Sequence, residues 1–254
     1  MSTTPHNHPI PDDTPSPAQL GAPVDAEAAT KELVPRLAIG VGVVAVLVVA
    51  LGGLARVVQD QEVNALDAFA SPFVHSFASP LVDALMTGAS TVGSVPSLLA
   101  LAAATALLAL ARRRPGLAAI VAVASVGVVV VNEVLKRVVA RPRPKLDWAT
   151  VLPDYSFPSG HTMDSIVVLA AIAFVAWALF GRRVGIVATG VAIGLALLIG
   201  FSRIYLGAHY LTDVIGGYLA GAIWLIAVLW AFRAAWRRRT REVATSGSGW
   251  PHHP

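Results

Sequence analysis

Three short polar clusters in the second half of the chain contain the side-chain types that phosphate chemistry needs. They are Lys136 with Arg143 and Pro144, then Pro158-Ser159-Gly160-His161, then Ser202-Arg203 followed by His209 and Asp213. Lysine and arginine bind phosphate oxygens, and a neutral histidine attacks phosphorus or transfers a proton. The clusters together predict a site that holds and attacks a phosphate.

The first cluster places a lysine and an arginine seven residues apart. Pro142 and Pro144 flank Arg143 and hold its backbone extended, which limits the positions that the guanidinium can reach. Glu133 is three residues before Lys136 and is expected to pair with it. Taken alone, the cluster is more typical of a basic loop that binds lipid headgroups.

The second cluster stands at the start of an apolar run. The first N–H groups of a helix lack internal partners, and the helix dipole favours an anion there. Gly160 lets the backbone approach a phosphate closely. Ser159 also suits a helix N-cap, and the two interpretations are compatible because a capping serine can meet a ligand as well.

The third cluster combines a histidine with a carboxylate. His209 and Asp213 are four residues apart, so one helical face carries both, and the carboxylate can hold one ring nitrogen while the other stays free. An isolated pair of this kind is more often structural. Arg203 precedes it across a turn that contains Gly207, and an arginine buried near a membrane requires an anion.

The composition indicates an integral membrane protein. Hydrophobic residues make up 56% of the chain and charged residues 13%, against about 25% charged in soluble proteins. Runs long enough to cross a bilayer predict an all-α bundle of six transmembrane helices. They cover residues 37–55, 92–111, 117–135, 162–180, 184–201 and 211–232.

The remaining segments are expected to be tails and interfacial helices. We expect a disordered tail at 1–32, a six-span domain at 33–236, and a basic, then flexible tail at 237–254. His6 and His8 are expected to be solvated rather than to bind metal. No cleaved signal peptide is expected at the N-terminus. Residues 63–81 show helical spacing broken by prolines at 72 and 80, which predicts short amphipathic helices with His75 as a packing or interfacial residue.

Basic residues in the short loops predict the orientation. Arginines cluster at 112–114, 182–183 and 233–241, which places those loops and both termini in the cytoplasm and the three polar clusters outside. The charge pattern favours an anionic ligand over nucleic acid. Without cysteine the chain has no thiolate ligand or nucleophile, and no acidic cluster suggests a metal, so no cofactor is expected.

The three clusters resemble the signature of the type 2 phosphatidic acid phosphatase superfamily, which includes membrane lipid phosphatases and vanadium haloperoxidases. The match extends over every signature position, in order and at the ends of expected spans. The resemblance implies that His209 is the nucleophile that becomes a phosphohistidine, that Asp213 orients it, and that His161 is the general acid. It implies that the phosphate oxygens are bound by Lys136, Arg143, Ser159, Gly160 and Arg203.

The resemblance also implies a substrate class, a lipid phosphate or lipid diphosphate in the plasma membrane. Undecaprenyl or another polyprenyl diphosphate is the first choice, with phosphatidylglycerophosphate and phosphatidic acid next. Nothing in the residues distinguishes a prenyl tail from an acyl tail. A haloperoxidase is disfavoured because those of the superfamily are soluble, and a non-catalytic lipid-binding protein is disfavoured because both histidines are present.

Overall fold

The computed structural model describes residues 26–59, 65–149 and 152–246, and within them every regular element is a helix. This part of the chain confirms the predicted all-α class. The helices are α1 (Ala26–Gln59), α2 (Ala65–His75), α3 (Pro80–Val92), α4 (Val95–Ala111), α5 (Pro115–Val139), α6 (Gly160–Tyr205) and α7 (Leu211–Ser246).

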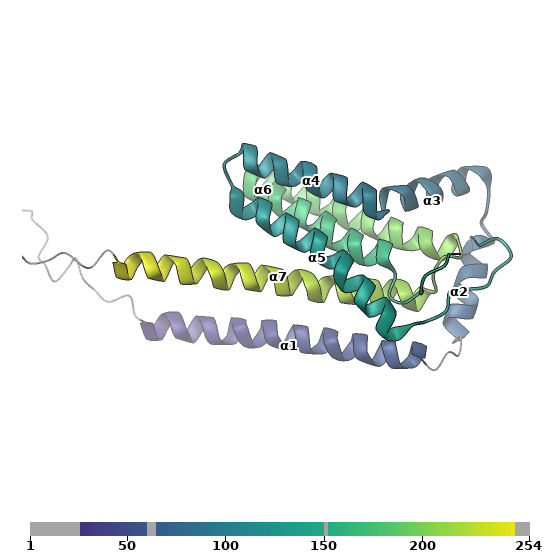
Figure 1. Ribbon diagram of the computed structural model, residues 1–254, viewed down its shortest axis with the longest axis horizontal. Coiled ribbons are helices and arrows are strands. Elements are labelled where there is room, and N and C mark those ends of the chain that lie inside the picture. Colours follow the sequence, from purple (N-terminus) through teal and green to yellow (C-terminus); the bar gives the residue numbers. More distant parts are fainter. Residues whose placement is uncertain (1–25, 60–64, 150–151, 247–254) are drawn as a thin grey trace, which may run out of the picture. The chain divides into compact units, whose positions relative to one another are not determined.

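The chain divides into two compact units, Met1–Val43 and Val44–Pro254. The described part of the first unit is the N-terminal portion of α1. The second unit contains the rest of α1 and the other six described helices, with α4, α5, α6 and α7 lying along one another (Figure 1). All three polar clusters belong to this second unit.

Helix α6 is folded in two at Gly181. Its 46 residues would extend about 69 Å as one straight helix, more than twice the thickness of a bilayer core. Gly181 has φ 80° and ψ −172°, a conformation that glycine adopts without strain. The two halves pack together: Trp177 Nε1 donates to Thr189 Oγ1 at 3.0 Å, and Leu169 shares a core cluster with Ile199.

Four described helices are long and apolar enough to cross a membrane, and α3 with α4 makes a fifth if this pair, bent by 54°, is one span. These helices are those of a membrane protein. This count is below the predicted six. Helix α6 is counted as one span, although it contains two of the expected apolar runs, 162–180 and 184–201. The bend between α3 and α4, at Gly93 and Ser94, lies inside the span expected at 92–111, because α3 ends at Val92 and α4 begins at Val95.

The core of the second unit holds α5, α6 and α7 together at the end where the polar clusters lie. Val128, Met163 and Ala220 form one buried cluster from these three helices. Gly217 is needed at the contact, since a Cβ there would lie 2.7 Å from the carbonyl oxygen of Ser159. Helix α7 therefore packs directly on the backbone that starts α6.

The short helices α2 and α3 confirm the helical segments predicted after the first span, but one predicted break is wrong. Pro72 lies inside α2, where the lost hydrogen bond is tolerated because the helix ends at His75. Pro80 does mark a boundary, following the N-cap Ser79 at the start of α3. Ser79 Oγ accepts a hydrogen bond from Val82 N.

The expected tails are partly helical. Helix α1 begins at Ala26, before the predicted boundary at residue 32, and α7 continues to Ser246, beyond the predicted boundary at 237. His6, His8 and residues 247–254 lie outside the described residues.

Candidate active site

Three cations from different segments lie near the two histidines His161 and His209. Lys136 lies in the last turn of α5, Arg143 in the following loop, and Arg203 in the last turn of α6. Arg143 Nη1 is 3.2 Å from His209 Nε2 and also donates to the Ala208 carbonyl at 2.6 Å. Arg203 and Arg143 are close enough to influence each other's charge. The structure thus gathers side chains from the first and third clusters at one histidine.

The second cluster joins the same site through the start of α6. Ser159 is the N-cap, as predicted, but its hydroxyl makes no capping bond and instead accepts from Thr162 Oγ1 at 3.0 Å. Ser159 N donates to the Asp213 carbonyl at 3.0 Å. Gly160 begins the helix, and His161 follows in its first turn, where it interacts electrostatically with Lys136 and His209.

The turn between α6 and α7 places His209. Gly207 has φ 65°, and both Ala208 N and His209 N donate to the Arg203 carbonyl, at 3.0 and 3.2 Å. This confirms the predicted glycine turn that connects the arginine to the histidine. Ser202 is fully buried, and its hydroxyl donates to the Ile199 carbonyl at 2.7 Å.

His209 is buried and faces Asp213, with a hydroxyl between them. His209 Nδ1 is 3.6 Å from Asp213 Oδ2, and Ser156 Oγ is 3.4 Å from the same nitrogen while it donates to the carboxylate. Burial lowers the pKa of His209 to about 4, against the opposing influence of the Asp213 carboxylate. The imidazole is therefore neutral at neutral pH, with Nε2 directed at Arg143.

Asp213 is fixed by a buried ionic network that the sequence did not reveal. Arg141 Nη1 donates to Asp213 Oδ1 at 2.6 Å and to Thr212 Oγ1 at 2.7 Å, and Arg141 Nη2 donates to Asp67 Oδ2 at 2.8 Å. Asp67 comes from α2 and also accepts from Thr212 N. Burial opposes the charge of Arg141, but the two carboxylates outweigh this and raise its pKa. Arg141 thus connects α2 to the pair formed by His209 and Asp213.

The buried guanidinium of Arg203 has a hydrogen-bond donor that no described residue accepts from. It is 7% exposed and donates to Ser90 Oγ on α3. Its Nε has no hydrogen-bond partner among the residues that the structure describes. A buried arginine with an unused donor beside Arg143 is suited to an anion.

One expected ion pair, Glu133 with Lys136, does not form, and each residue has another partner. Glu133 Oε1 pairs with Arg137 Nη2 at 2.8 Å and not with Lys136, because the four-residue spacing brings the longer arginine to it. Lys136 instead pairs with Asp154.

His75 is a packing residue, as predicted: its ring stacks on the ring of Trp148 with centroids 4.5 Å apart.

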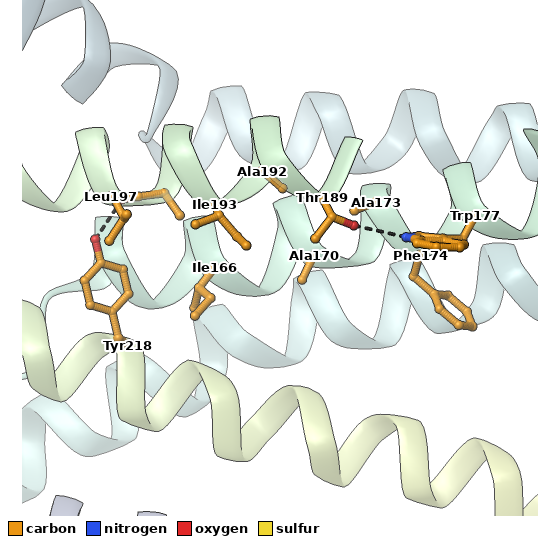
Figure 2. A pocket seen from close by; sticks show the side chains of 11 residues that line it. Ile166, Ala170, Ala173, Phe174, Trp177, Thr189, Ala192, Ile193, Leu197 and Tyr218 are labelled. Carbon is orange, nitrogen blue, oxygen red and sulfur yellow. Dashed lines mark hydrogen bonds between the residues drawn. The ribbon is translucent and has the colours of Figure 1, made fainter. Parts of the chain in front are cut away.

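An apolar cavity of about 400 Å³ lies apart from this cluster, between the two halves of α6 and α7. Figure 2 shows Ile166 and Phe174 from one half opposite Ile193 and Leu197 from the other, with Tyr218 at one end. No acid, base or cation lines this cavity. It suits an apolar group and cannot perform phosphate chemistry.

The chemistry available at the site is anion binding with nucleophilic attack. A neutral imidazole nitrogen, three cations and a helix start lie close together, which is what transfer of a phosphoryl group to histidine requires. Within the described ranges no group of three or more His, Asp or Glu residues has a metal-binding arrangement.

Sequence reasoning missed Arg141, Asp67, Asp154 and Ser156. Arg141 left a signal, as a basic residue in a loop predicted to be extracytoplasmic, where arginine is disfavoured. Asp154 and Ser156 lie in an irregular loop without periodicity, and Asp67 looked like the polar side of an amphipathic helix. Their roles depend on contacts between segments distant in sequence.

Comparison with known proteins agrees with this geometry. The PAP2 superfamily model matches residues 115–237. The chain is 36% identical over 99 residues to phosphatidylglycerophosphatase B of Bacillus subtilis, covering 36% of this chain and 46% of the relative. It is 35% identical over 101 residues to the undecaprenyl-diphosphatase BcrC of the same organism, covering 37% of this chain and 47% of the relative. The chain therefore spans about half the length of the curated relatives it matches.

A solved structure is similar over a longer stretch. The crystal structure of a transmembrane PAP2 type phosphatidylglycerolphosphate phosphatase from Bacillus subtilis has a TM-score of 0.65 and 26% identity. The alignment covers 75% of this chain and 96% of that one. The helices that carry the three clusters thus share their arrangement with a membrane phosphatase.

Proposed function

We propose that the protein hydrolyses a lipid phosphate or lipid diphosphate through a phosphohistidine on His209, since residues 115–237 match the PAP2 superfamily model. The observation that carries the proposal is the position of Arg143 Nη1, 3.2 Å from His209 Nε2. A guanidinium at that distance from a neutral nucleophile can hold a phosphate oxygen while the nitrogen attacks phosphorus.

In the first step, His209 Nε2 forms a bond to phosphorus and the bond from phosphorus to the leaving oxygen breaks. His161 donates a proton to that oxygen, so the lipid departs as an alcohol or a monophosphate. Asp213 stabilises the positive charge that develops on the His209 ring, and Ser156 and Arg141 hold the carboxylate. Lys136, Arg143, Arg203, Ser159 and the Gly160 N–H bind the remaining phosphate oxygens.

In the second step, water attacks the phosphohistidine and the bond from phosphorus to Nε2 breaks. His161, now neutral, accepts a proton from that water, which returns both histidines to their starting states. Inorganic phosphate is released. The step uses side-chain cations and backbone donors for charge stabilisation, as the first step does.

We further propose that the chain crosses the membrane six times and that the active site is extracytoplasmic. The bent pair of α3 and α4 is then one crossing, and the two halves of α6 are two crossings, since each half has about the length that a bilayer requires. Arg182 and Arg183 then lie in the short turn between the two halves, on the side where basic residues are favoured.

The preferred substrate is undecaprenyl or another polyprenyl diphosphate, followed by phosphatidylglycerophosphate and phosphatidic acid. The similarity to relatives named for the first two substrates supports the lipid phosphate class. The apolar cavity of about 400 Å³ has the volume typical of small-molecule sites and can receive part of a lipid chain.

The test is release of inorganic phosphate by the purified protein in detergent micelles. The panel contains a polyprenyl diphosphate, phosphatidylglycerophosphate, phosphatidate, lysophosphatidate and nitrophenyl phosphate. We expect turnover of at least one lipid, with the highest kcat/KM for the polyprenyl diphosphate. Turnover of nitrophenyl phosphate alone would reject the lipid assignment, and no turnover of any compound by folded protein would reject the phosphatase assignment.

A further inference from the structure

The carboxylate of Asp154 lies between two of the cations that surround His209. Asp154 Oδ1 accepts from Arg143 Nε at 3.0 Å and from Arg143 Nη2 at 2.6 Å, and Oδ2 pairs with Lys136 Nζ. Two oxygens of one anionic group thus engage Lys136 and Arg143 together. This is the arrangement that two oxygens of a bound phosphate would make.

We propose that Asp154 is an internal ligand of the phosphate site, which it occupies in the free protein, leaves when a phosphate enters, and re-enters to release inorganic phosphate. The inference rests on the proposed function for the identity of the anion. It assigns to Asp154 a part in every cycle of binding and release, although the residue touches no reacting atom.

The exposure of the groups makes this exchange feasible. The Asp154 side chain is 46% exposed, whereas those of Lys136 and Arg143 are each 10% exposed. The carboxylate can therefore move into water without losing a buried environment, while the cations remain in place. Asp213 cannot exchange in this way, because its side chain is 0% exposed and held by Arg141.

Two contacts with backbone oxygens hold Arg143 in place without the Asp154 carboxylate. Its Nη1 donates to the Ala208 carbonyl at 2.6 Å, and its Nε also donates to the backbone carbonyl of Asp154 at 3.1 Å. Both contacts involve backbone oxygens that any residue at position 154 retains. Removing the carboxylate should therefore free two cations without displacing the arginine.

The Asp154 carboxylate remains charged at neutral pH. Burial favours the neutral form, but hydrogen bonds and charge from Lys136 and Arg143 outweigh it and lower the pKa of Asp154 to about 2. Substrate and inorganic phosphate both have to displace this same charged group. Removal of the charge should therefore tighten the binding of both by one common factor.

The experiment measures the dissociation constant of inorganic phosphate by titration calorimetry and the KM for nitrophenyl phosphate, using the full chain in detergent micelles. The variants are Asp154→Asn and Asp154→Ser. Ion pairs with a partly exposed partner are individually weak, so we expect both constants to fall together by about tenfold, equivalent to about 1.4 kcal/mol. If phosphate release limits turnover, kcat also falls. The matched control is Asp147→Asn, an exposed aspartate in the same loop, which should leave both constants within about twofold.

Each other outcome overturns the inference. A rise in both constants would mean that the carboxylate positions Arg143, and unchanged constants would mean that it does not compete. Loss of folded protein in both variants would show that the carboxylate is structural. The proposed function fails separately, if the wild-type protein binds no phosphate and hydrolyses no ester.

Discussion

Replacement of Arg141 by methionine should damage both stability and catalysis, because one guanidinium neutralises two buried carboxylates. The Arg141 side chain is 3% exposed, and those of Asp67 and Asp213 are each 0% exposed. Removing one partner of a buried ion pair typically costs about 3–5 kcal/mol, since the remaining charge stays buried without compensation. Methionine keeps most of the apolar stem volume and so isolates the loss of charge.

The predicted magnitude can be measured as thermal unfolding in detergent micelles. At roughly 2–4 °C per kcal/mol for a chain of this size, the midpoint should fall by about 6–20 °C. The kcat for nitrophenyl phosphate should fall more than the KM changes, because Asp213 would stabilise the His209 cation less well in the transition state. Arg141→Lys should recover part of the stability, since lysine keeps the charge but cannot bridge both carboxylates.

The control is Arg137→Met, which removes an arginine whose side chain is 72% exposed and pairs with Glu133 in the same helix. An exposed pair contributes about 0–1 kcal/mol, so the midpoint should move by no more than about 4 °C. A double-mutant cycle between Arg141 and Asp67 should show coupling of about 0.5–3 kcal/mol. Equal midpoints for Arg141→Met and Arg137→Met would refute the network.

Three further results are expected. EDTA should leave activity unchanged and vanadate should inhibit, because side-chain cations and helix N–H groups make the anion site; loss of activity in EDTA with recovery in magnesium would contradict this. A cysteine at Asp147 should react with an impermeant maleimide in intact cells and one at Arg183 should not, and the reverse would invert the topology. Burial lowers the pKa of His209 in the folded protein from 6.5 to about 4. As the pH falls, His209 therefore binds a proton in the unfolded chain before it does so in the folded protein. Thermal stability should therefore fall as the pH drops from 6.5 toward 4, and His209→Gln should reduce this loss; equal slopes would reject the assignment.

The sequence allowed the all-α class and the gathering of the three clusters to be predicted, for physical reasons. Long apolar runs can only be buried helices or membrane spans, and glycines such as Gly207 mark turns where the backbone must reverse. The spacing of His209 and Asp213 predicted that they would face each other, and they do, 3.6 Å apart. The expectation that one helical face carries both is wrong, because α7 begins at Leu211 and His209 lies in the turn before it. These signals are local, so neighbouring residues are sufficient to reveal them.

The supporting contacts could not be predicted because they are not local. Arg141 meets Asp67 across 74 positions and Asp213 across 72 positions of the chain. Asp154 lies in an irregular loop, so nothing in its spacing indicated that it would pair with Lys136. Glu133 shows the limit of local reasoning even in a helix, because two basic residues were within reach and it pairs with Arg137.

The central claim is that His209 carries the phosphoryl group, and trapping of the phosphoenzyme tests it most directly. Wild-type protein is mixed with labelled nitrophenyl phosphate, quenched within milliseconds in alkaline denaturant, and examined for phosphohistidine by mass spectrometry. His161→Ala should still form the intermediate, because nitrophenolate leaves without a proton, although it should hydrolyse phosphatidate about 10²–10⁴-fold more slowly. His209→Ala should form none. A phosphoenzyme in His209→Ala, or phosphate attached at another residue of the wild-type protein, would contradict the account.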